Sequence, residues 1–470
     1  MSGHLNHTLE VVLQNILDME GGSENTKNLI TWLRANDSQI AQHADSLDVV
    51  IDKLSPASNA AALCILLNIQ MSRMTFRDPQ YTFAYIGNFC KTCDPTQIRR
   101  VNREFVDLVL QYSKVALENN QAMTALPALR AAVERFRPYE WVLTPLHSEF
   151  LKVCLKAKHY TYALPVLDKP ILDVMPKYTL TSVFGFLLYF YYGGLIYIGV
   201  KRFHSALQCF HICLGCPGQA VSAIQMDAWK KFVLVTMIET GEVPAPPKNI
   251  SQALSRVLQH RSMAASIGTA YYELTECFRR RDMSKLRTLL SAPEAADAFN
   301  RDQNLGLAKQ CLPALQRRLV LQLTSTYLTL SLEDIRTKAH IGSIAETESL
   351  LFDMITRGQL CAQIDHESNH VVFTDDGDQH EEASAAGPSG GADESVRTAA
   401  DLDRQITQML TIARQLKKYE NDLSLNENYL RRQMGSASEF SAAGGLGLDE
   451  DGLRGGGSGG LDYGELIDDV

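Results

Sequence analysis

The spacing of apolar and polar residues predicts helices along most of the chain. From Leu5 to about Ala292, apolar residues recur at helical intervals in pieces of about 15 to 25 residues. Breaks separate the pieces at Gly21-Gly22, Ser55-Pro56, Asp78-Pro79, Asp94-Pro95, Arg137-Pro138, Lys169-Pro170, Cys216-Pro217-Gly218 and Pro244 to Pro247. This arrangement favours antiparallel helix pairs. We identify no alternating strand pattern before residue 360.

One helix pair, at residues 190–217, fits a tetratricopeptide-like repeat. In such a repeat, glycine lets two helices cross closely, alanine lies at the crossing, and aromatic residues fill the space between them. The residues in these positions are Phe190, Gly193, Gly194, Tyr197, Ala206 and Phe210. The pattern predicts a right-handed helical solenoid, with unrelated helix hairpins as the alternative.

Beyond residue 300 the pattern changes to that of a small α+β module. A helix pair ends in a short extended piece at 328–330, and Ser331 with Asp334 forms a capping box that begins a helix. Ser343 with Glu346 forms a second box, and Gly358 ends the helix that it begins. Strand candidates follow at 361–365 and 370–374. Strand, helix, helix and hairpin is the order of a winged helix.

The last strand candidate of this module suggests an assembly surface. Val371, Val372 and Phe373 form a short apolar strand near its end. An exposed sheet edge presents unpaired backbone N–H and C=O groups to a partner strand. We predict that this strand is the edge through which the module binds a partner.

After residue 374 the chain consists of an acidic segment, a segment with an apolar seam, and a Gly-rich tail. Residues 375–397 are acidic and contain Gly, Ser and Pro, as in a solvated linker, and from Gly435 onward 11 of 36 residues are glycine, which predicts a disordered tail. Between them lies an apolar seam typical of a helical bundle. Its residues, proposed to contact partner subunits, are Leu402, Ile406, Met409, Ala413 and Leu416.

These patterns define an all-α fold class with a small α+β winged helix near its end. The expected divisions are an N-terminal solenoid at 1–200, a second domain at 201–374 (helical part 201–326, winged helix 327–374), a linker at 375–397, a bundle helix at 398–434 and a tail at 435–470.

The net charge excludes few classes of function, because many of the acidic residues lie in two short segments. The net charge is -9, but residues 374–396 and 435–470 each contribute -7, which leaves +5 for the rest. Such a balance gives no general indication of nucleic acid or membrane binding. The winged-helix segment 327–365 has a net charge of -3, and its second helix carries three acidic residues and one Arg. Because DNA readout needs basic side chains on that helix, nucleic acid is not the expected partner.

One uncharged stretch is long enough to span a bilayer. No charged residue occurs between Lys177 and Lys201. The stretch contains five tyrosines and four glycines, which favour a buried helix pair over the alternative of a membrane span.

Ten cysteines are scattered through apolar helical segments. With no secretory signal in the first residues, they indicate free thiols in a reducing compartment, for which we expect the nucleus and cytoplasm. Cys90 with Cys93 and Cys213 with Cys216 form two C-x-x-C pairs, formally four zinc ligands. More than a hundred residues separate the pairs, so buried thiols are favoured over a metal site. We expect no metal and no cofactor.

Catalytic motifs are missing from the sequence. It contains no zinc-isopeptidase H-x-H pattern with a downstream Asp, no H-E-x-x-H, no G-x-S-x-G and no nucleotide-binding G-x-x-x-x-G-K-[ST]. The twelve histidines are dispersed. We therefore expect a protein that is not an enzyme.

A solenoid followed by a winged helix resembles the PCI family, which the proteasome lid, the COP-9 signalosome and translation initiation factor 3 share. Within it, the chain resembles the third signalosome subunits from about residue 145 to 374 and again at 400–434. The resemblance is carried by LYFYYGGLIYIGVKRFHSALQCF, RDQNLGLAKQCLPALQRRL and LTSTYLTLSLEDI. The acidic insertion at 375–397 and the Gly-rich tail depart from that pattern.

The resemblance implies a non-catalytic scaffold in the complex that removes a ubiquitin-like modifier from cullins. Its partners would be the other PCI and MPN subunits and, through the complex, cullin-RING ubiquitin ligases. PCI subunits join through winged-helix strands and gather their C-terminal helices into one bundle. A subunit of the proteasome lid or of initiation factor 3 is the alternative that shares the fold.

Overall fold

A computed structural model describes residues 7–18, 23–73, 79–218, 220–250, 252–259, 268–365, 369–373 and 392–425. They fall into two units, divided between residues 385 and 386. The helical fold class predicted from the sequence is confirmed.

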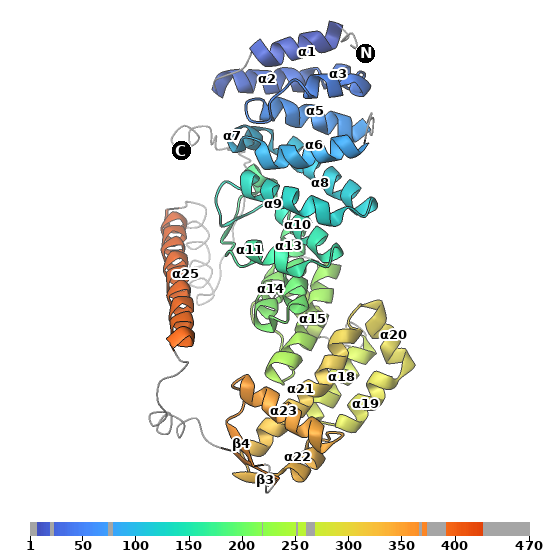
Figure 1. The fold of residues 1–470 in the computed structure, drawn as a ribbon, viewed down its shortest axis with the longest axis vertical. Helices are drawn as coiled ribbons and strands as arrows, with labels where there is room; N and C mark the ends of the chain where they lie inside the picture. The colour runs from blue at the N-terminus through green and yellow to red at the C-terminus, as the bar shows by residue number, and fades with distance from the viewer. Residues whose placement is uncertain are drawn as a thin grey trace, which may run out of the picture. The chain divides into compact units, whose positions relative to one another are not determined.

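The first helices of unit 1 stack one upon the next, with α1 and α2 at one end (Figure 1). Helix α5 packs against α8, and α6 packs against α9. Asp94 caps its helix by accepting hydrogen bonds from the backbone N–H groups of Thr96 and Gln97. The elements are α1 (His7–Asp18), α2 (Ser23–Ala35), α3 (Asp37–Ala41), η1 (Ala44–Ser46), α4 (Asp48–Ile51), α5 (Ala60–Arg73), α6 (Pro79–Thr92), α7 (Pro95–Ile98), η2 (Arg99–Val101), α8 (Asn102–Glu118) and α9 (Ala122–Phe136).

The stack continues through the middle of the chain, where α10 packs against both α9 and α13, α13 against α14, and α14 against α15. Ser222 and Gln225 form a capping box at the start of α15, and Gly241 ends that helix with φ +70°. The elements are α10 (Pro145–Lys156), η3 (Tyr160–Ala163), α11 (Leu164–Leu167), α12 (Pro176–Thr179), α13 (Val183–Gly199), α14 (Phe203–Gly215), α15 (Ala223–Thr240), α16 (Gln252–Gln259), α18 (Thr269–Arg280), α19 (Met283–Ser291), α20 (Pro293–Arg301) and α21 (Leu305–Thr324).

The structure brings the six residues of the repeat pattern together at the crossing of α13 and α14. Ala206 and Phe210 are completely buried, and Phe190 and Tyr197 are nearly so. A Cβ atom on Gly194 would lie 2.5 Å from Cε1 of Phe210, and one on Gly193 would lie 3.1 Å from Cδ2 of Leu167. These two glycines therefore set how closely α13 approaches its neighbours.

The hydrophobic core does not divide at residue 200, where we expected a domain boundary. That position lies in the turn between α13 and α14, which share one core extending from Leu9 to Leu315. A second, smaller core extends from Val320 to Phe373. Helix α21 contributes side chains to both cores. It therefore links the solenoid to the module that follows it.

The second core belongs to a module with the element order expected of a winged helix. Its elements are β3 (Thr329–Ser331), α22 (Leu332–Lys338), α23 (Ile344–Thr356), β4 (Ala362–Asp365) and β5 (His370–Phe373). Both helices begin at the predicted serines, because Ser331 and Ser343 accept hydrogen bonds from the N–H groups of Asp334 and Glu346. Neither acidic side chain returns a bond to the serine N–H, so the predicted capping boxes are only half formed. Gly358 follows α23 with φ +66°. The three strands form an antiparallel sheet in the order β3-β5-β4.

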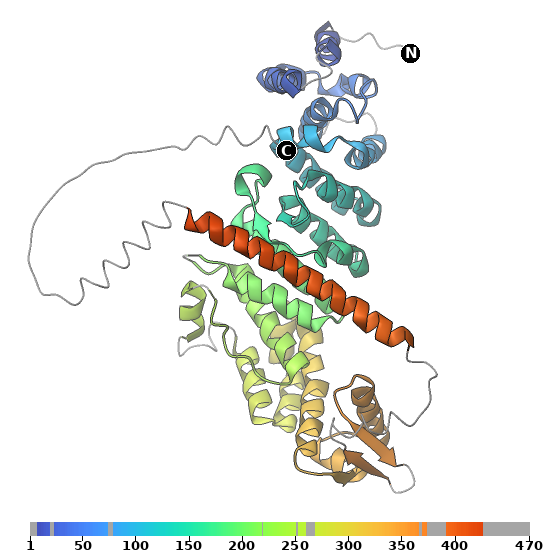
Figure 2. The ribbon, with the colours of Figure 1, turned by 90° about the vertical axis from the view of Figure 1, so that its left-hand side faces the viewer.

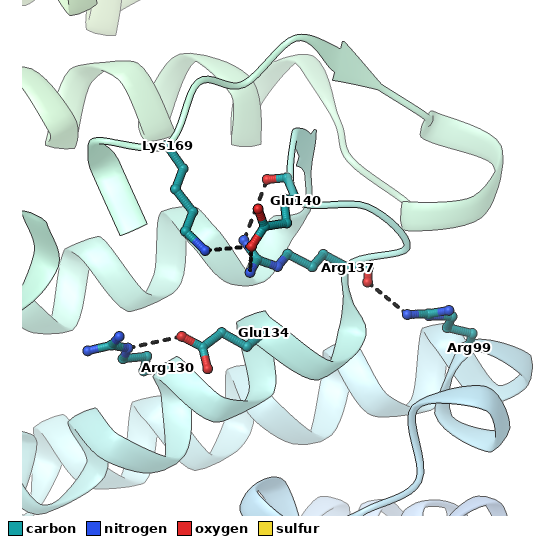
Figure 3. A network of polar contacts seen from close by, with 6 residues as sticks. All are labelled: Arg99, Arg130, Glu134, Arg137, Glu140 and Lys169. Carbon is teal, nitrogen blue, oxygen red and sulfur yellow. Dashed lines mark hydrogen bonds and ion pairs between the residues drawn. The ribbon is translucent and has the colours of Figure 1, made fainter. Parts of the chain in front are cut away.

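A polar network links the α9–α10 connection to the segment between α11 and α12, and each of these carries a short strand that was not predicted from the sequence. Strand β1 (Val142–Leu143) pairs in parallel with β2 (Asp173–Val174). Beside it, Lys169 donates to Glu140 at 2.7 Å, and Arg137 donates to the same carboxylate at 3.3 Å (Figure 3). Arg99 donates to the Arg137 carbonyl at 2.9 Å. The segment 168–174 is thereby attached to the preceding repeat.

Unit 2 contains one continuous helix, α25 (Ala392–Ser424), shown in Figure 2. It begins before residue 398, so its first turns lie in the segment that we interpreted as linker. The segment Ala392–Arg397 lacks Gly and Pro, and nothing local prevents the helix from extending to it. The tail at 435–470 and residues 426–434 of the predicted bundle helix lie outside the described residues.

Candidate assembly surfaces

Strand β5, which carries Val371, Val372 and Phe373, is the central strand of the sheet. It pairs with β3 on one side and with β4 on the other. Val371 and Phe373 are buried in the smaller core, and Val372 is 40% exposed on the outer face. The prediction that this strand forms an exposed edge is therefore wrong, because both of its sides are already occupied by pairing within the module.

The free sides of the sheet belong to β3 and β4. The Phe373 N–H donates to the Leu328 carbonyl, and the Leu332 N–H donates to the Asn369 carbonyl, so alternate residues of β5 point their backbone groups toward β3. His370 and Val372 consequently point theirs toward Asp365 and Gln363 of β4. The backbone N–H and C=O of Ile364 then point away from β5, to the outer side of the sheet.

An apolar surface on α23 lies beside this β4 edge. Ala345, Glu348, Ser349 and Phe352 occupy one side of α23 and line a shallow groove of about 320 Å³ together with Ile364 of β4. Phe352 is 67% exposed. A strand edge next to an exposed aromatic side chain is suited to strand addition, with backbone hydrogen bonds along β4 and an anchoring contact at Phe352. This surface of α23 was not predicted from the sequence, although SLLFDMI has more apolar residues than one buried face needs.

The basic side chains of the winged helix are engaged within the module. Arg336 pairs with Glu333 at 2.5 Å, and Arg357 pairs with Asp353 at 2.9 Å. The Lys338 ammonium lies 3.9 Å from the centre of the Tyr327 ring. Contacts with phosphates would have to displace these interactions. The module is therefore better suited to a protein partner than to DNA.

Helix α25 presents an apolar stripe. Ile406, Met409, Ala413 and Leu416 recur at bundle spacing along it, and all four side chains are exposed. Leu402, the first member of the seam, lies in the same helix, but its side chain is outside the described residues. An exposed apolar stripe of this length is typical of helices that pack against other helices.

The titratable groups with the largest pKa shifts are buried structural groups. Burial lowers the pKa of His147 to about 3, and its imidazole accepts the backbone N–H of Thr144 at 3.1 Å in the cap of α10. Burial also raises the pKa of Cys93 to about 11 and that of Cys213 to about 12. A neutral buried imidazole and protonated thiols stabilise packing and do not supply a nucleophile at neutral pH.

The two C-x-x-C pairs occupy different repeats. Cys90 lies in α6 with Cys93 just after it, whereas Cys213 lies in α14 with Cys216 just after it. All ten cysteines are among the described residues, and none of them forms a disulfide. Across the described ranges, no three His, Cys, Asp or Glu side chains are grouped as a metal ion would need. Among those same residues, no helix combines the length and the hydropathy of a membrane span.

Most of the chain matches known protein families and individual relatives. Residues 23–254 match the family model for the N-terminal helical repeats of COP9 signalosome complex subunit 3, and residues 286–375 match that of the PCI domain. The chain is 30% identical to COP9 signalosome complex subunit 3 of Arabidopsis thaliana over 436 residues, which cover 92% of this chain and 94% of the relative. It is 27% identical to the protein of that name from Drosophila melanogaster over 426 residues, covering 86% and 89%.

Proposed function

Because the chain belongs to the COP9 signalosome subunit 3 family, we propose that it is a non-catalytic scaffold subunit of such a complex. In that role it supports the removal of a ubiquitin-like modifier from cullins and so regulates ubiquitin-dependent protein degradation. Its partners are the other PCI and MPN subunits and, through the complex, cullin-RING ligases. We place it in both nucleus and cytoplasm.

The observation that carries this proposal is the match of both family models along one chain, in the order solenoid then PCI domain. The structure adds two surfaces suited to assembly, the β4 edge beside Phe352 and the exposed stripe of α25. Large pKa shifts at buried caps and core thiols support a structural role for those groups.

Affinity purification of the tagged full chain, followed by mass spectrometry, tests the proposed assembly. We expect PCI and MPN subunits of a signalosome in amounts comparable to the chain itself. Recovery of proteasome-lid or initiation-factor subunits in their place would support the alternative subunit assignment and overturn ours. Fluorescence microscopy of the tagged chain should show both nuclear and cytoplasmic signal.

A second experiment tests the non-catalytic role. The purified chain alone should leave a modified cullin intact, whereas the complex assembled with the chain should cleave it faster than the complex assembled without it. Cleavage by the chain alone, sensitive to a chelator, would show that the chain carries its own metal-dependent hydrolase site.

A further inference from the structure

The segment that follows α15 contains three prolines within four residues. Residues 243–248 read VPAPPK and lie in neither a helix nor a strand. Proline fixes its own φ near −65°, and it keeps the residue before it in an extended conformation. Pro244, Pro246 and Pro247 therefore favour the polyproline II conformation, the left-handed extended helix with three residues per turn.

The burial of the segment follows the three-residue period of that conformation. Pro244 and Pro247 are one turn apart, and both are half-buried. Ala245 and Lys248 are also one turn apart, and both are exposed. Pro246 is exposed as well. The segment therefore turns one side toward the solenoid and presents Ala245, Pro246 and Lys248 to solvent.

Both ends of the segment are fixed to the solenoid. At its start, Arg318 of α21 pairs with Glu242 at 2.5 Å, and the Val243 side chain packs against the core of the solenoid. At its end, a Cβ atom on Gly215 would lie 3.2 Å from the carbonyl oxygen of Asn249, so the backbone there lies against the end of α14. A segment held at both ends loses little conformational freedom when a partner binds it.

The backbone and the charge of the segment are available to a partner. Within the described residues, no hydrogen bond involves the backbone of residues 243–248, and Lys248 forms no ion pair. The chain has no acidic residue between Glu242 and Glu273, and the groove that Asn249 lines beside α14 contains no acidic side chain. Carboxylates of a partner would therefore be attracted to Lys248 with little repulsion nearby.

The exposed side of the segment determines which kind of groove can bind it. Domains that recognise proline-rich segments do so with aromatic-lined grooves. SH3 domains contact both prolines of a P-x-x-P sequence, but Pro244 and Pro247, which form that sequence, are half-buried on the solenoid side. WW domains clamp one X–Pro dipeptide between aromatic rings. The exposed dipeptide Ala245–Pro246 is suited to this second kind of groove.

We propose that residues 243–248 are the docking segment for a partner protein that carries a WW-type groove bordered by carboxylates. The aromatic rings of the groove hold Pro246, and a carboxylate beside them pairs with Lys248. The prolines hold the segment in its binding conformation beforehand, which lowers the entropic cost of association. The segment shares no residue with the β4 edge or with α25, so this partner is additional to the subunits proposed above.

Binding of the fluorescently labelled full chain to a panel of purified WW domains tests the proposal. At least one domain should bind the wild-type chain, and Pro246→Ala should weaken that binding at least about tenfold, because it removes the ring that the groove clamps. Pro293→Ala is the matched control. It changes the exposed proline of another Ala–Pro dipeptide, where the proline begins α20, and should leave the binding unchanged. A panel without a binding domain, or equal binding of wild type and Pro246→Ala, would overturn the proposal.

Charge substitutions test the second contact. Lys248→Glu should weaken the same binding about tenfold, whereas Lys309→Glu, the same change at an exposed lysine of α21, should not. Raising the salt from about 0.05 M to about 0.5 M should weaken binding of the wild type more than that of Lys248→Gln. Equal effects of Lys248→Glu and Lys309→Glu would refute the contact with a carboxylate.

A panel of purified SH3 domains forms the second arm of the experiment. We expect no SH3 domain to bind the full chain at residues 243–248, because the half-buried prolines would first have to leave the solenoid. Binding by SH3 domains in place of WW domains, lost in Pro244→Ala, would show that the other side of the segment is recognised and would overturn the proposal. Thermal unfolding followed by circular dichroism should give the wild-type melting temperature for Pro246→Ala, because its side chain is exposed.

Discussion

Replacing Gly194 with Leu should destabilise the solenoid through a single contact. Gly194 lies in α13 against the ring of Phe210 in α14, where its own Cβ would already be 2.5 Å from Cε1 and 2.6 Å from Cζ. Carbon atoms of packed side chains lie about 3.5–4.0 Å apart. The two helices would therefore have to separate by about 1 Å, or Phe210 would have to move.

Phe210 has little room to move, because it is completely buried. Overpacking a closed core costs about 1–3 kcal/mol, and a Leu side chain should lie at the upper end of that range. Replacing a helical glycine also gains about 1 kcal/mol through helix propensity. The expected net effect is a loss of about 2 kcal/mol in the free energy of unfolding.

Gly306 in α21 provides the matched control. It is also helical, but a Cβ there meets no atom within 4 Å. Gly306→Leu should therefore leave the free energy of unfolding unchanged or raise it slightly. The comparison separates helix propensity, which both changes share, from packing at the α13–α14 crossing.

Urea unfolding followed by far-ultraviolet circular dichroism measures both variants. Adding Phe210→Ala to Gly194→Leu should cost less than the sum of the two single changes, by at least about 1 kcal/mol, because the smaller side chain makes room for Leu. A Gly194→Leu variant that unfolds at the wild-type urea concentration, or strictly additive single changes, would refute the close crossing.

Three further predictions concern assembly and pH. Ile364→Pro removes an N–H from the outer side of β4 and should weaken co-purification with partner subunits. Because Ile364 also packs against the smaller core, this change should lower the melting temperature somewhat, but less than Val372→Pro, which removes an N–H used within the sheet. Equal effects of the two would argue against the β4 edge. Deleting residues 392–434 should abolish stable incorporation into the complex with no change in the melting temperature of the remaining chain, and a marked drop would show that α25 belongs to the chain's own core. Because burial holds the pKa of His147 at about 3, below its ordinary 6.5, the unfolded chain binds more protons between these values, and stability should fall as the pH drops below about 6.5. His147→Gln, which preserves the capping geometry, should show a weaker fall between about pH 7 and 5; an identical profile would exclude His147 as a cause.

The residues that begin and end helices could be predicted from the sequence, because the hydrogen bonds that they make lie within one helical turn. Ser331 with Asp334, Ser343 with Glu346, and Gly358 satisfy backbone groups within one turn of the helices that they begin or end. The same holds for the pattern from Phe190 to Phe210, since both helices of the crossing are adjacent in the chain. These residues predicted the helical fold, the solenoid and the order of elements in the last module.

Sheet order and surface exposure were decided only by the tertiary structure. Which strand becomes central depends on pairing between β3 and β5, which are separated by α22, α23 and β4. Three strands as short as these carry no local signal for their order in the sheet. The prediction based on the most apolar strand, β5, therefore chose the wrong edge. Likewise, α13 is apolar around most of its circumference, so its pattern cannot show that Val183 and Phe184 remain exposed while Leu187 and Phe190 are buried. That distinction arises because α13 packs against α10, α14 and α15, whose positions around it only the tertiary structure decides.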